Sequence, residues 1–164
     1  MLKFTICFLK RGNEILMLNR EFPEWMGVWN GVGGKIDDGE TPLECILREV
    51  NEETGITLKD KQVTYKGNIT WTDPENTYYG GMYAFVAELP NNFTYDTPIK
   101  TEEGILDWKD ISWLLHPENR GVADLSYHLA TLLHDESCYE HQLTYANDKV
   151  VQCSKTPLKQ FVGK

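Results

Sequence analysis

The chain opens with two apolar runs that predict a β-hairpin. Residues 3–20, KFTICFLKRGNEILMLNR, place strand-length apolar segments on either side of the turn Arg11–Asn13. Residues 21–34 are rich in Trp, Gly and Pro and have no helical period. We therefore expect a loop there that leads through a short strand into a glycine turn.

The next segment carries the start and stop signals of a helix. Thr41 can act as the N-cap, Pro42 suits the first helical position, and Glu44 completes a capping box with Thr41. Gly55 lies where a helix C-terminus is expected. At about 100° per residue, one side of this helix is predicted to carry Leu43, Ile46, Leu47, Val50 and the methyl group of Thr54, and the other Glu49, Glu52 and Glu53.

The rest of the chain alternates between strand and helix signals. Strands are predicted in residues 62–71, 78–89 and 104–115, and a helix from about Val122 to His134. Residues 141–154 predict a last hairpin that turns at Asn147–Asp148. This order predicts a single domain over residues 1–164, of the α/β or α+β class, with a mixed sheet packed between helices.

Composition and charge narrow the classes of function. The 164 residues include 41% hydrophobic and 12% aromatic residues, which is typical of a folded chain. The net charge of −9, without a dense basic run, argues against nucleic-acid polymers and anionic membranes as partners. Lys3, Lys10, Arg11 and Glu14 interrupt the apolar N-terminus, which argues against a signal peptide or membrane span.

The four cysteines are far apart in the sequence. Cys7, Cys45, Cys138 and Cys153 form no CxxC pair, so we expect free thiols and a cytoplasmic protein rather than a zinc site. The four histidines show no catalytic or metal-binding spacing.

Three acidic residues on the first predicted helix suggest a cation site. Glu49, Glu52 and Glu53 are spaced i, i+3 and i+4, so their carboxylates are neighbours. Two such charges about 5 Å apart repel by roughly 3 kcal/mol at an effective dielectric of about 20. Mg²⁺ prefers oxygen ligands and could relieve that repulsion. The alternative is a solvated helix face, but the preceding glycines of GVGGK would let the backbone approach a ligand closely.

Taken together, nine positions fit one motif. The Nudix box, G-x5-E-x7-R-E-U-x-E-E-x-G-U with U a bulky aliphatic, is satisfied by Gly34, Glu40, Arg48, Glu49, Val50, Glu52, Glu53, Gly55 and Ile56. The chain therefore resembles a Nudix hydrolase. The resemblance implies the Nudix fold and an Mg²⁺- or Mn²⁺-dependent hydrolase of a nucleoside diphosphate linked to another moiety.

The same resemblance implies roles for individual residues. Glu49, Glu52 and Glu53 would be metal ligands, together with the carbonyl of Gly33. Arg48 would orient these carboxylates through charge-assisted hydrogen bonds, and Glu40 would support the loop.

The general base is left open between Glu49 and a glutamate from outside the motif. The segment TEEGILDWKDI resembles the late glutamate–glycine loop of the family, and it indicates Glu103 as base and further ligand, with Glu102 as the reserve.

The stretch GVWNGVGGKI resembles the MutT-like group that hydrolyses oxidised purine nucleoside triphosphates such as 8-oxo-dGTP. The resemblance implies substrate-binding roles for Asn30, Arg20, Lys35 and Asp124. An amide such as that of Asn30 offers both a donor and an acceptor to a purine edge. The group carries an acidic pair where this chain has Ala123–Asp124. Stacking surface could come from Phe22, Trp25, Trp29 and Trp113.

We therefore expect an enzyme of nucleotide-pool sanitation that releases nucleoside monophosphate and pyrophosphate. The alternatives are hydrolysis of ADP-ribose, a nucleotide sugar or a capped RNA 5′ end, and a nucleotide-sensing module without catalysis. The expected partner is a small nucleotide, and the chain is expected to be a monomer or homodimer.

Overall fold

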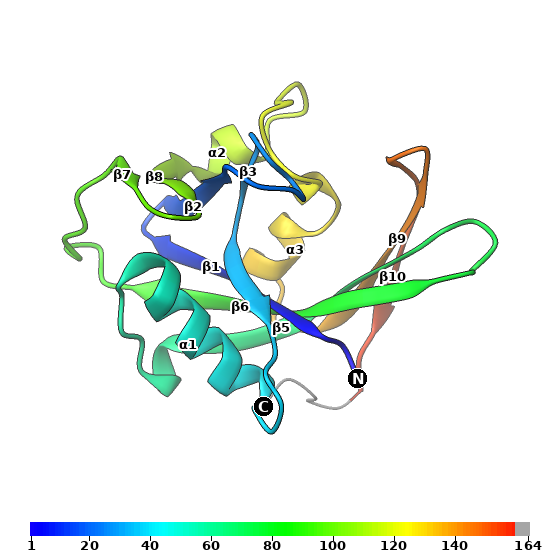
Figure 1. Ribbon diagram of the computed structural model, residues 1–164, viewed down its shortest axis with the longest axis horizontal. Helices are drawn as coiled ribbons and strands as arrows, with labels where there is room; N and C mark the ends of the chain where they lie inside the picture. Colours follow the sequence, from blue (N-terminus) through cyan, green and yellow to red (C-terminus); the bar gives the residue numbers. More distant parts are fainter. Residues whose placement is uncertain (160–164) are drawn as a thin grey trace.

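A computed structural model describes residues 1–159, which are built on one mixed ten-stranded sheet (Figure 1). The longest path through the sheet runs β10-β9-β5-β6-β1-β2-β8-β7, while β3 pairs with β2 and β4 pairs with β1. Two pairs are parallel, β1 with β6 and β5 with β9. The strands are β1 (Phe4–Arg11), β2 (Glu14–Arg20), β3 (Trp29–Asn30), β4 (Val32–Lys35), β5 (Val63–Thr72), β6 (Tyr79–Leu89), β7 (Ile99–Lys100), β8 (Gly104–Asp110), β9 (Tyr139–Ala146) and β10 (Lys149–Pro157).

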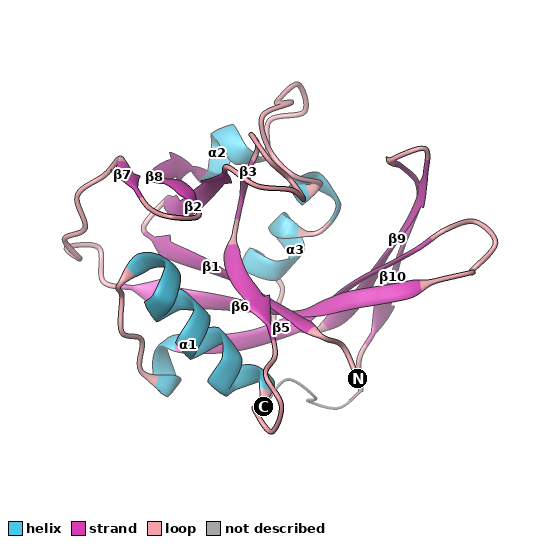
Figure 2. Cartoon of the chain, viewed as in Figure 1, coloured by secondary structure: helices cyan, strands magenta, loops and turns pink. Residues whose placement is uncertain are grey.

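Apart from α1, the helices of the described residues are short (Figure 2). The helices are α1 (Pro42–Thr54), η1 (Asp60–Gln62), α2 (Ile111–Leu114), η2 (Leu125–Tyr127) and α3 (Leu129–His134). Ile46 and Val50 of α1 join one buried apolar cluster with Phe85 of β6, whereas Leu129 of α3 joins a second cluster with Phe8 of β1. Alternate residues of the strands thus feed two cores, one on each face. The predicted mixed sheet between helices is confirmed.

The first hairpin and the long helix form as predicted. Arg11 pairs with Glu14 across the turn of β1 and β2. Thr41 accepts a hydrogen bond from the backbone N–H of Glu44, whose carboxylate accepts one from Thr41, so the capping box is present. Gly55 ends α1 with a φ of 79°, a left-handed conformation that glycine adopts without strain.

The glycine segment is a strand rather than the predicted turn. Residues Val32–Lys35 form β4, antiparallel to the first half of β1. A Cβ atom at Gly33 would lie 2.1 Å from the carbonyl oxygen of Thr5, so only glycine permits this close pairing. The glycines therefore let a strand approach β1, and they carry the chain directly beneath α1.

Two late predictions need correction. Strand β8 ends at Asp110, where its pairing with Glu14 of β2 ends, and the residues after it form α2. The predicted helix from Val122 to His134 is instead broken into η2 and α3. Trp29 exchanges backbone hydrogen bonds with Gly121 and Ala123, which holds residues 121–123 extended against β3 and delays the helix.

The C-terminal hairpin forms where it was predicted. Lys149 pairs with Ala146, and the two loop residues Asn147 and Asp148 have φ values of 53° and 63°. Positive φ at both positions is typical of a type I′ turn. Strand β9 extends the sheet beyond β5, so the hairpin projects beside the β5–β6 hairpin on the side away from α1 (Figure 1).

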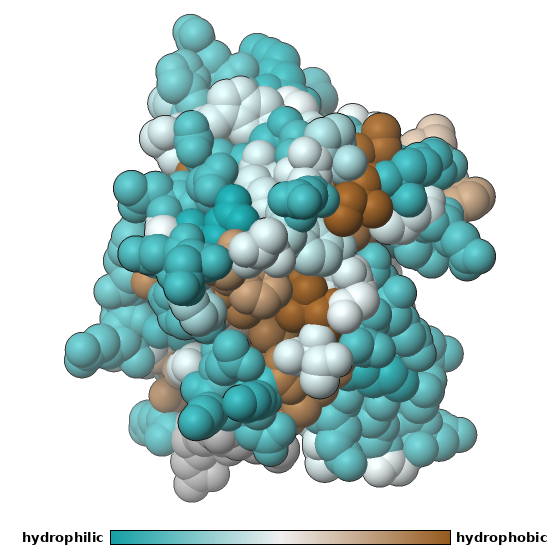
Figure 3. Space-filling model, turned by 90° about the vertical axis from the view of Figure 1, so that its left-hand side faces the viewer, coloured by the Kyte–Doolittle hydropathy of each residue, from teal (hydrophilic) through white to brown (hydrophobic). Residues whose placement is uncertain are grey.

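The surface is largely polar on the face that Figure 3 presents, with hydrophobic residues gathered near its centre and again toward the upper right. Among the described helices, none is long and apolar enough to cross a membrane.

Candidate functional site

Helix α1 presents its charged residues in two directions. Its buried side chains are Pro42, Cys45, Ile46, Val50 and Thr54. Glu52 is mostly exposed, whereas Glu49 and Glu53 are partly buried and line a cavity against the sheet. The predicted division into an apolar side and an acidic side is therefore incomplete, because two of the three glutamates turn inward.

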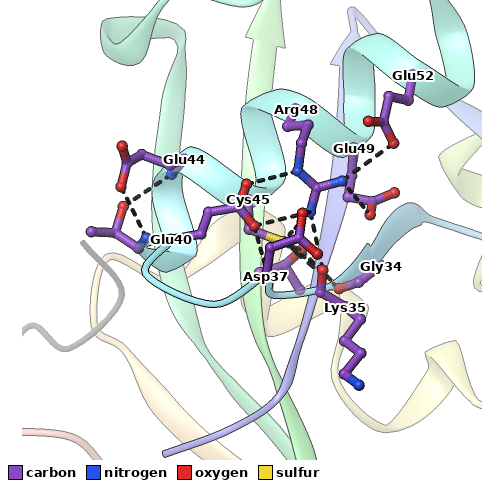
Figure 4. A network of polar contacts seen from close by, with 11 residues as sticks. Gly34, Lys35, Asp37, Glu40, Glu44, Cys45, Arg48, Glu49 and Glu52 are labelled. Carbon is purple, nitrogen blue, oxygen red and sulfur yellow. Dashed lines mark hydrogen bonds and ion pairs between the residues drawn. The ribbon is translucent and has the colours of Figure 1, made fainter.

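Arg48 is the centre of a charged network that joins α1 to the loop before it (Figure 4). Its Nε and Nη2 donate to the two carboxylate oxygens of Glu40 at 2.7 and 2.9 Å. Its Nη1 donates to Glu49 at 2.9 Å and to Glu52 at 3.2 Å. Nη2 also donates to the Lys35 carbonyl at 3.1 Å. A bidentate, charge-assisted pair of this kind fixes the guanidinium plane.

The network sets the charge state of Glu40. Its hydrogen bonds with Arg48 lower the pKa of Glu40 to about 2, so this carboxylate is ionised throughout the neutral range. The same partners raise the pKa of Arg48. Glu40 thus anchors Arg48, and Arg48 in turn holds one oxygen of Glu49.

Glu53 has a different environment. Burial, followed by the nearby charges of Glu49 and Glu103, raises its pKa to about 8, against a lowering hydrogen bond from the Gly33 backbone. Its Oε2 is buried and has no hydrogen-bond partner among the described residues. A buried carboxylate oxygen without a partner is costly unless a ligand or cation satisfies it.

Backbone glycine makes room for Glu49. A Cβ atom at Gly34 would lie 2.5 Å from the carboxylate carbon of Glu49. Burial also raises the pKa of Glu49, while its hydrogen bond with Arg48 lowers it. The glycine at this position of β4 therefore allows an α1 carboxylate to lie directly against the strand.

Two further glutamates reach this region from the loop before β8. Glu103 is exposed and lines both a cavity of about 580 Å³ with the α1 glutamates and a larger one of about 1010 Å³. Glu102 lines only the smaller cavity. Thr101 Oγ1 accepts hydrogen bonds from the backbone N–H groups of Glu103 and Gly104, which fixes the turn.

The oxygen atoms at this site are of the kind that a hard cation such as Mg²⁺ prefers, but they do not converge on one position. Glu49, Glu53 and the Gly33 backbone line one cavity, and Glu53 Oε2 lacks a partner within the described residues. Within residues 1–159, however, no three His, Cys, Asp or Glu side chains converge as a ready metal site. Because Arg48 holds both Glu49 and Glu52, these carboxylates would have to turn toward a cation as it binds.

The larger cavity also contains three of the four predicted substrate-binding residues, Arg20, Asn30 and Lys35. Asn30 Oδ1 accepts a hydrogen bond from the Gly31 N–H at 2.9 Å. Arg20 Nη2 donates to the Pro23 carbonyl at 3.3 Å, and its buried Nε has no partner among the described residues. The carboxylates and the predicted base-reading residue therefore open into the same space.

The fourth residue, Asp124, is not among the described residues that line this cavity. Its Oδ2 accepts a hydrogen bond at 2.6 Å from the hydroxyl of Tyr145, which does line it. Asp124 therefore faces a side chain of the C-terminal hairpin.

The aromatic residues of the cavity differ from those expected. Of the four candidates, Trp25 lines the cavity, and Trp29 and Trp113 are not among its described lining residues. The rings of Trp29 and Trp113 instead contact the ammonium group of Lys109, whose Nζ lies 4.4 Å and 5.4 Å from their centroids. Phe22 is exposed and does not line the cavity. Sequence reasoning missed Phe4, Trp71, Tyr78 and Tyr145. They lie in or beside predicted strands, where aromatic residues usually indicate core or sheet packing.

Comparisons with known proteins show the family to which the chain belongs. A family model described as NUDIX domain matches residues 2–129. The uncharacterized Nudix hydrolase YvcI of Bacillus subtilis is 28% identical over 110 residues, which cover 67% of this chain and 66% of YvcI. The NAD-capped RNA hydrolase NudC of Haemophilus influenzae is 35% identical over 110 residues, covering 57% of this chain and 39% of NudC. The chain thus spans less than two thirds of either relative.

Among solved structures, the MutT protein from Bacillus halodurans matches with a TM-score of 0.73 at 24% identity. The match covers 94% of this chain and 97% of that one. At this identity, the match supports the fold alone.

Proposed function

The chain belongs to the NUDIX domain family, and we propose that it is a divalent-metal-dependent pyrophosphohydrolase of purine nucleoside triphosphates. In the proposed reaction, the oxygen of water bonds to the α-phosphorus, and the bond from that phosphorus to the bridging oxygen breaks. The products are a nucleoside monophosphate and pyrophosphate. We propose 8-oxo-dGTP or a related purine deoxynucleotide as the substrate.

One observation carries this proposal: a single cavity contains both the inward-facing carboxylates of α1 and Asn30. Glu49 and Glu53 lie at the end where a diphosphate would be cleaved, and the amide of Asn30 can read a purine edge. Lys35 and Arg20 line the same space and supply positive charge for phosphate oxygens.

The residues that would hold the cation are Glu49, Glu52, Glu53 and the carbonyl of Gly33. When bound, Mg²⁺ or Mn²⁺ would neutralise charge on the diphosphate oxygens and make the attacking water more acidic. Arg48 keeps one oxygen of Glu49 engaged at 2.9 Å and so limits the orientations of the other. Glu40, ionised and bidentate, prevents Arg48 from turning away.

Glu103 is our choice for the residue that removes a proton from the attacking water. It is exposed, lines both cavities, and lies close enough to Glu53 for its charge to raise the pKa of Glu53. An exposed carboxylate beside the cleavage site can accept a proton from water and pass it to solvent. Glu49 has less freedom for this task because Arg48 holds it.

A second candidate keeps the chemistry and changes the leaving group. The likeness to an NAD-capped RNA hydrolase and the cavity of about 1010 Å³ favour a nucleoside diphosphate joined to a further group, such as ADP-ribose, a nucleotide sugar or a nucleotide cap. This volume lies at the upper end of the range for ligand pockets, about 300–1000 Å³.

A substrate panel tests the proposal. The chain would be incubated with Mg²⁺ or Mn²⁺ and dNTPs, oxidised dNTPs, ADP-ribose, nucleotide sugars or NAD, and the products identified by chromatography. We expect the highest kcat/KM for a purine triphosphate, with monophosphate and pyrophosphate as products. Faster cleavage of ADP-ribose or NAD would favour the second candidate. No product from any compound would leave a nucleotide-sensing role.

A further inference from the structure

The end of the large cavity away from α1 is formed partly by a segment outside the family match. The NUDIX domain model ends at residue 129, whereas Tyr145 and Asp148, which line the cavity, belong to the β9–β10 hairpin. The hairpin lies on the side of the sheet away from α1 (Figure 1). The family motif therefore determines the carboxylate end of the cavity but not this one.

Tyr145 is held in place by a hydrogen bond to Asp124, a residue outside the β9–β10 hairpin. Its hydroxyl donates to Asp124 Oδ2 at 2.6 Å, and Asp124 directly precedes η2. Burial and this hydrogen bond raise the pKa of Tyr145, so the phenol stays neutral and remains a donor. The Tyr145 side chain packs partly against the second buried cluster, and it also lines the cavity.

The backbone of the hairpin restricts Tyr145 further. Strand β9 pairs in parallel with β5, where Leu143 is opposite Trp71, and the two-residue turn at Asn147–Asp148 closes the hairpin tightly. Trp71 and Tyr78 line the same cavity. Three aromatic side chains from two hairpins thus border the end of the cavity away from α1.

We propose that Tyr145, positioned by Asp124, binds the nucleobase by providing an aromatic surface, so that bases that stack more strongly are preferred. The proposal rests on the proposed function, because it assigns the base to this end and the phosphates to the α1 end. Asp148 at the tip is acceptor-only when ionised, which favours base edges that carry N–H groups. Stacking of one base on an aromatic side chain contributes about a tenfold to hundredfold gain in binding.

Three variants separate the ring from its hydrogen bond. Tyr145→Ala removes both, Tyr145→Phe keeps the ring, and Asp124→Ala removes the acceptor that positions the hydroxyl. Tyr79→Ala, at an exposed tyrosine that does not line the cavity, is the matched control. For each protein, kcat and KM would be measured for purine and pyrimidine triphosphates. Calorimetry would give the affinities for nucleoside monophosphates and for pyrophosphate.

We expect Tyr145→Ala to raise KM for the preferred purine substrate about tenfold or more, with kcat within about twofold. Monophosphate binding should weaken to the same extent, and pyrophosphate binding should not change. Tyr145→Phe and Asp124→Ala should each raise KM about threefold. The double variant should raise KM no further, because both changes remove the same hydrogen bond.

The inference and the proposed function fail in different ways. An unchanged ranking of substrates in Tyr145→Ala, with hydrolysis intact, overturns the role of Tyr145 and leaves the hydrolase assignment standing. Equal loss of monophosphate and pyrophosphate binding also overturns it, because a base contact would not affect pyrophosphate. If no nucleotide is hydrolysed, selective loss of monophosphate binding in Tyr145→Ala still supports the base contact while the proposed function falls.

Discussion

The two ends of the large cavity are built on different principles. At the α1 end, charged side chains are fixed by other charges: Arg48 holds Glu40, Glu49 and Glu52. At the hairpin end, aromatic side chains are fixed by strand pairing and by one hydrogen bond, from Tyr145 to Asp124. The first end can therefore be altered by changing charge at constant volume, and the second by changing ring packing at constant charge.

The largest effect is expected from Glu53→Gln. This change removes a charge and hardly any volume at the carboxylate whose Oε2 lacks a partner among the described residues. We expect kcat to fall by about a hundredfold or more, since even residues that only support a metal ligand typically contribute about tenfold to a hundredfold. The melting temperature should stay the same or rise, because burial raises the pKa of Glu53 to about 8, so folding near pH 7 must protonate a group that is ionised in the unfolded chain, and glutamine avoids this cost. Glu136→Gln at an exposed site is the control, and turnover near the wild-type rate would remove Glu53 from the cation site.

Gly34→Ala tests the same end through shape instead of charge. The new Cβ would lie 2.5 Å from the Glu49 carboxylate carbon, so the Glu49 carboxylate must shift from its position beside Arg48. We expect kcat to fall by roughly tenfold to a hundredfold, as for other changes that misplace a ligand. Gly121→Ala, whose Cβ would meet no atom closer than 3.4 Å, is the matched control. Equal activity of the two variants would show that Glu49 needs no such room.

Acid should lower the free energy of unfolding through two buried histidines near the β9–β10 hairpin. His128 and His141 are buried with ring centroids 6.1 Å apart, and burial is the main cause that lowers their pKa values to about 3 and about 4. The unfolded histidines, near pKa 6.5, bind protons that the folded ones do not, so stability is lost as pH falls below about 6.5. The loss should reach about 2 kcal/mol per histidine at pH 5.

Urea unfolding at pH 7 and pH 5 measures this loss. His128→Leu should make the free energy of unfolding less dependent on pH over this interval, whereas His134→Ala, at an exposed site, should not. The same slope in both variants would assign the acid sensitivity to other groups.

Asn30→Ala should change selectivity more than rate. The amide oxygen accepts a hydrogen bond from the Gly31 N–H, and Asn30 lines the cavity. We expect discrimination between purines to fall about tenfold, the usual value of one lost hydrogen bond to substrate, while kcat changes little. The ratio of kcat/KM for oxidised and unmodified dGTP measures it, with Asn92→Ala at an exposed site as control. A constant ratio would exclude Asn30 from base recognition.

The smallest effect is expected from Gly80→Ala. Trp71 packs across Gly80 of the neighbouring strand, and a Cβ there would lie 2.3 Å from its indole nitrogen. The ring must shift, so KM for a purine nucleotide should rise a few fold, roughly the lower part of the range for base stacking. Gly121→Ala again serves as the control. A fall in kcat without a change in KM would place Trp71 outside the base site.

Much of the α1 end could be predicted from the sequence. The capping box, the C-terminal glycine of α1 and the Nudix box are short-range patterns, because helix geometry fixes the relative positions of residues three and four apart. The sequence could not indicate that Arg48 binds Glu49 and Glu52 in positions where they do not converge on one point, since the position of Arg48 depends on the loop that carries Glu40. Among the described residues, no group of side chains forms a ready metal site. The cation site and the substrate remain predictions for the experiments above.

At the hairpin end, the sequence determined the elements but not their neighbours. It predicted the β9–β10 hairpin and its Asn147–Asp148 turn, because turn chemistry is local. Only the tertiary structure brought Tyr145 to Asp124 and Trp71 to the cavity, through parallel pairing of β9 with β5. Pairing between strands some 70 residues apart is set by the packing of the whole sheet. The sequence therefore indicated the Nudix family, and the tertiary structure decided which side chains line the large cavity.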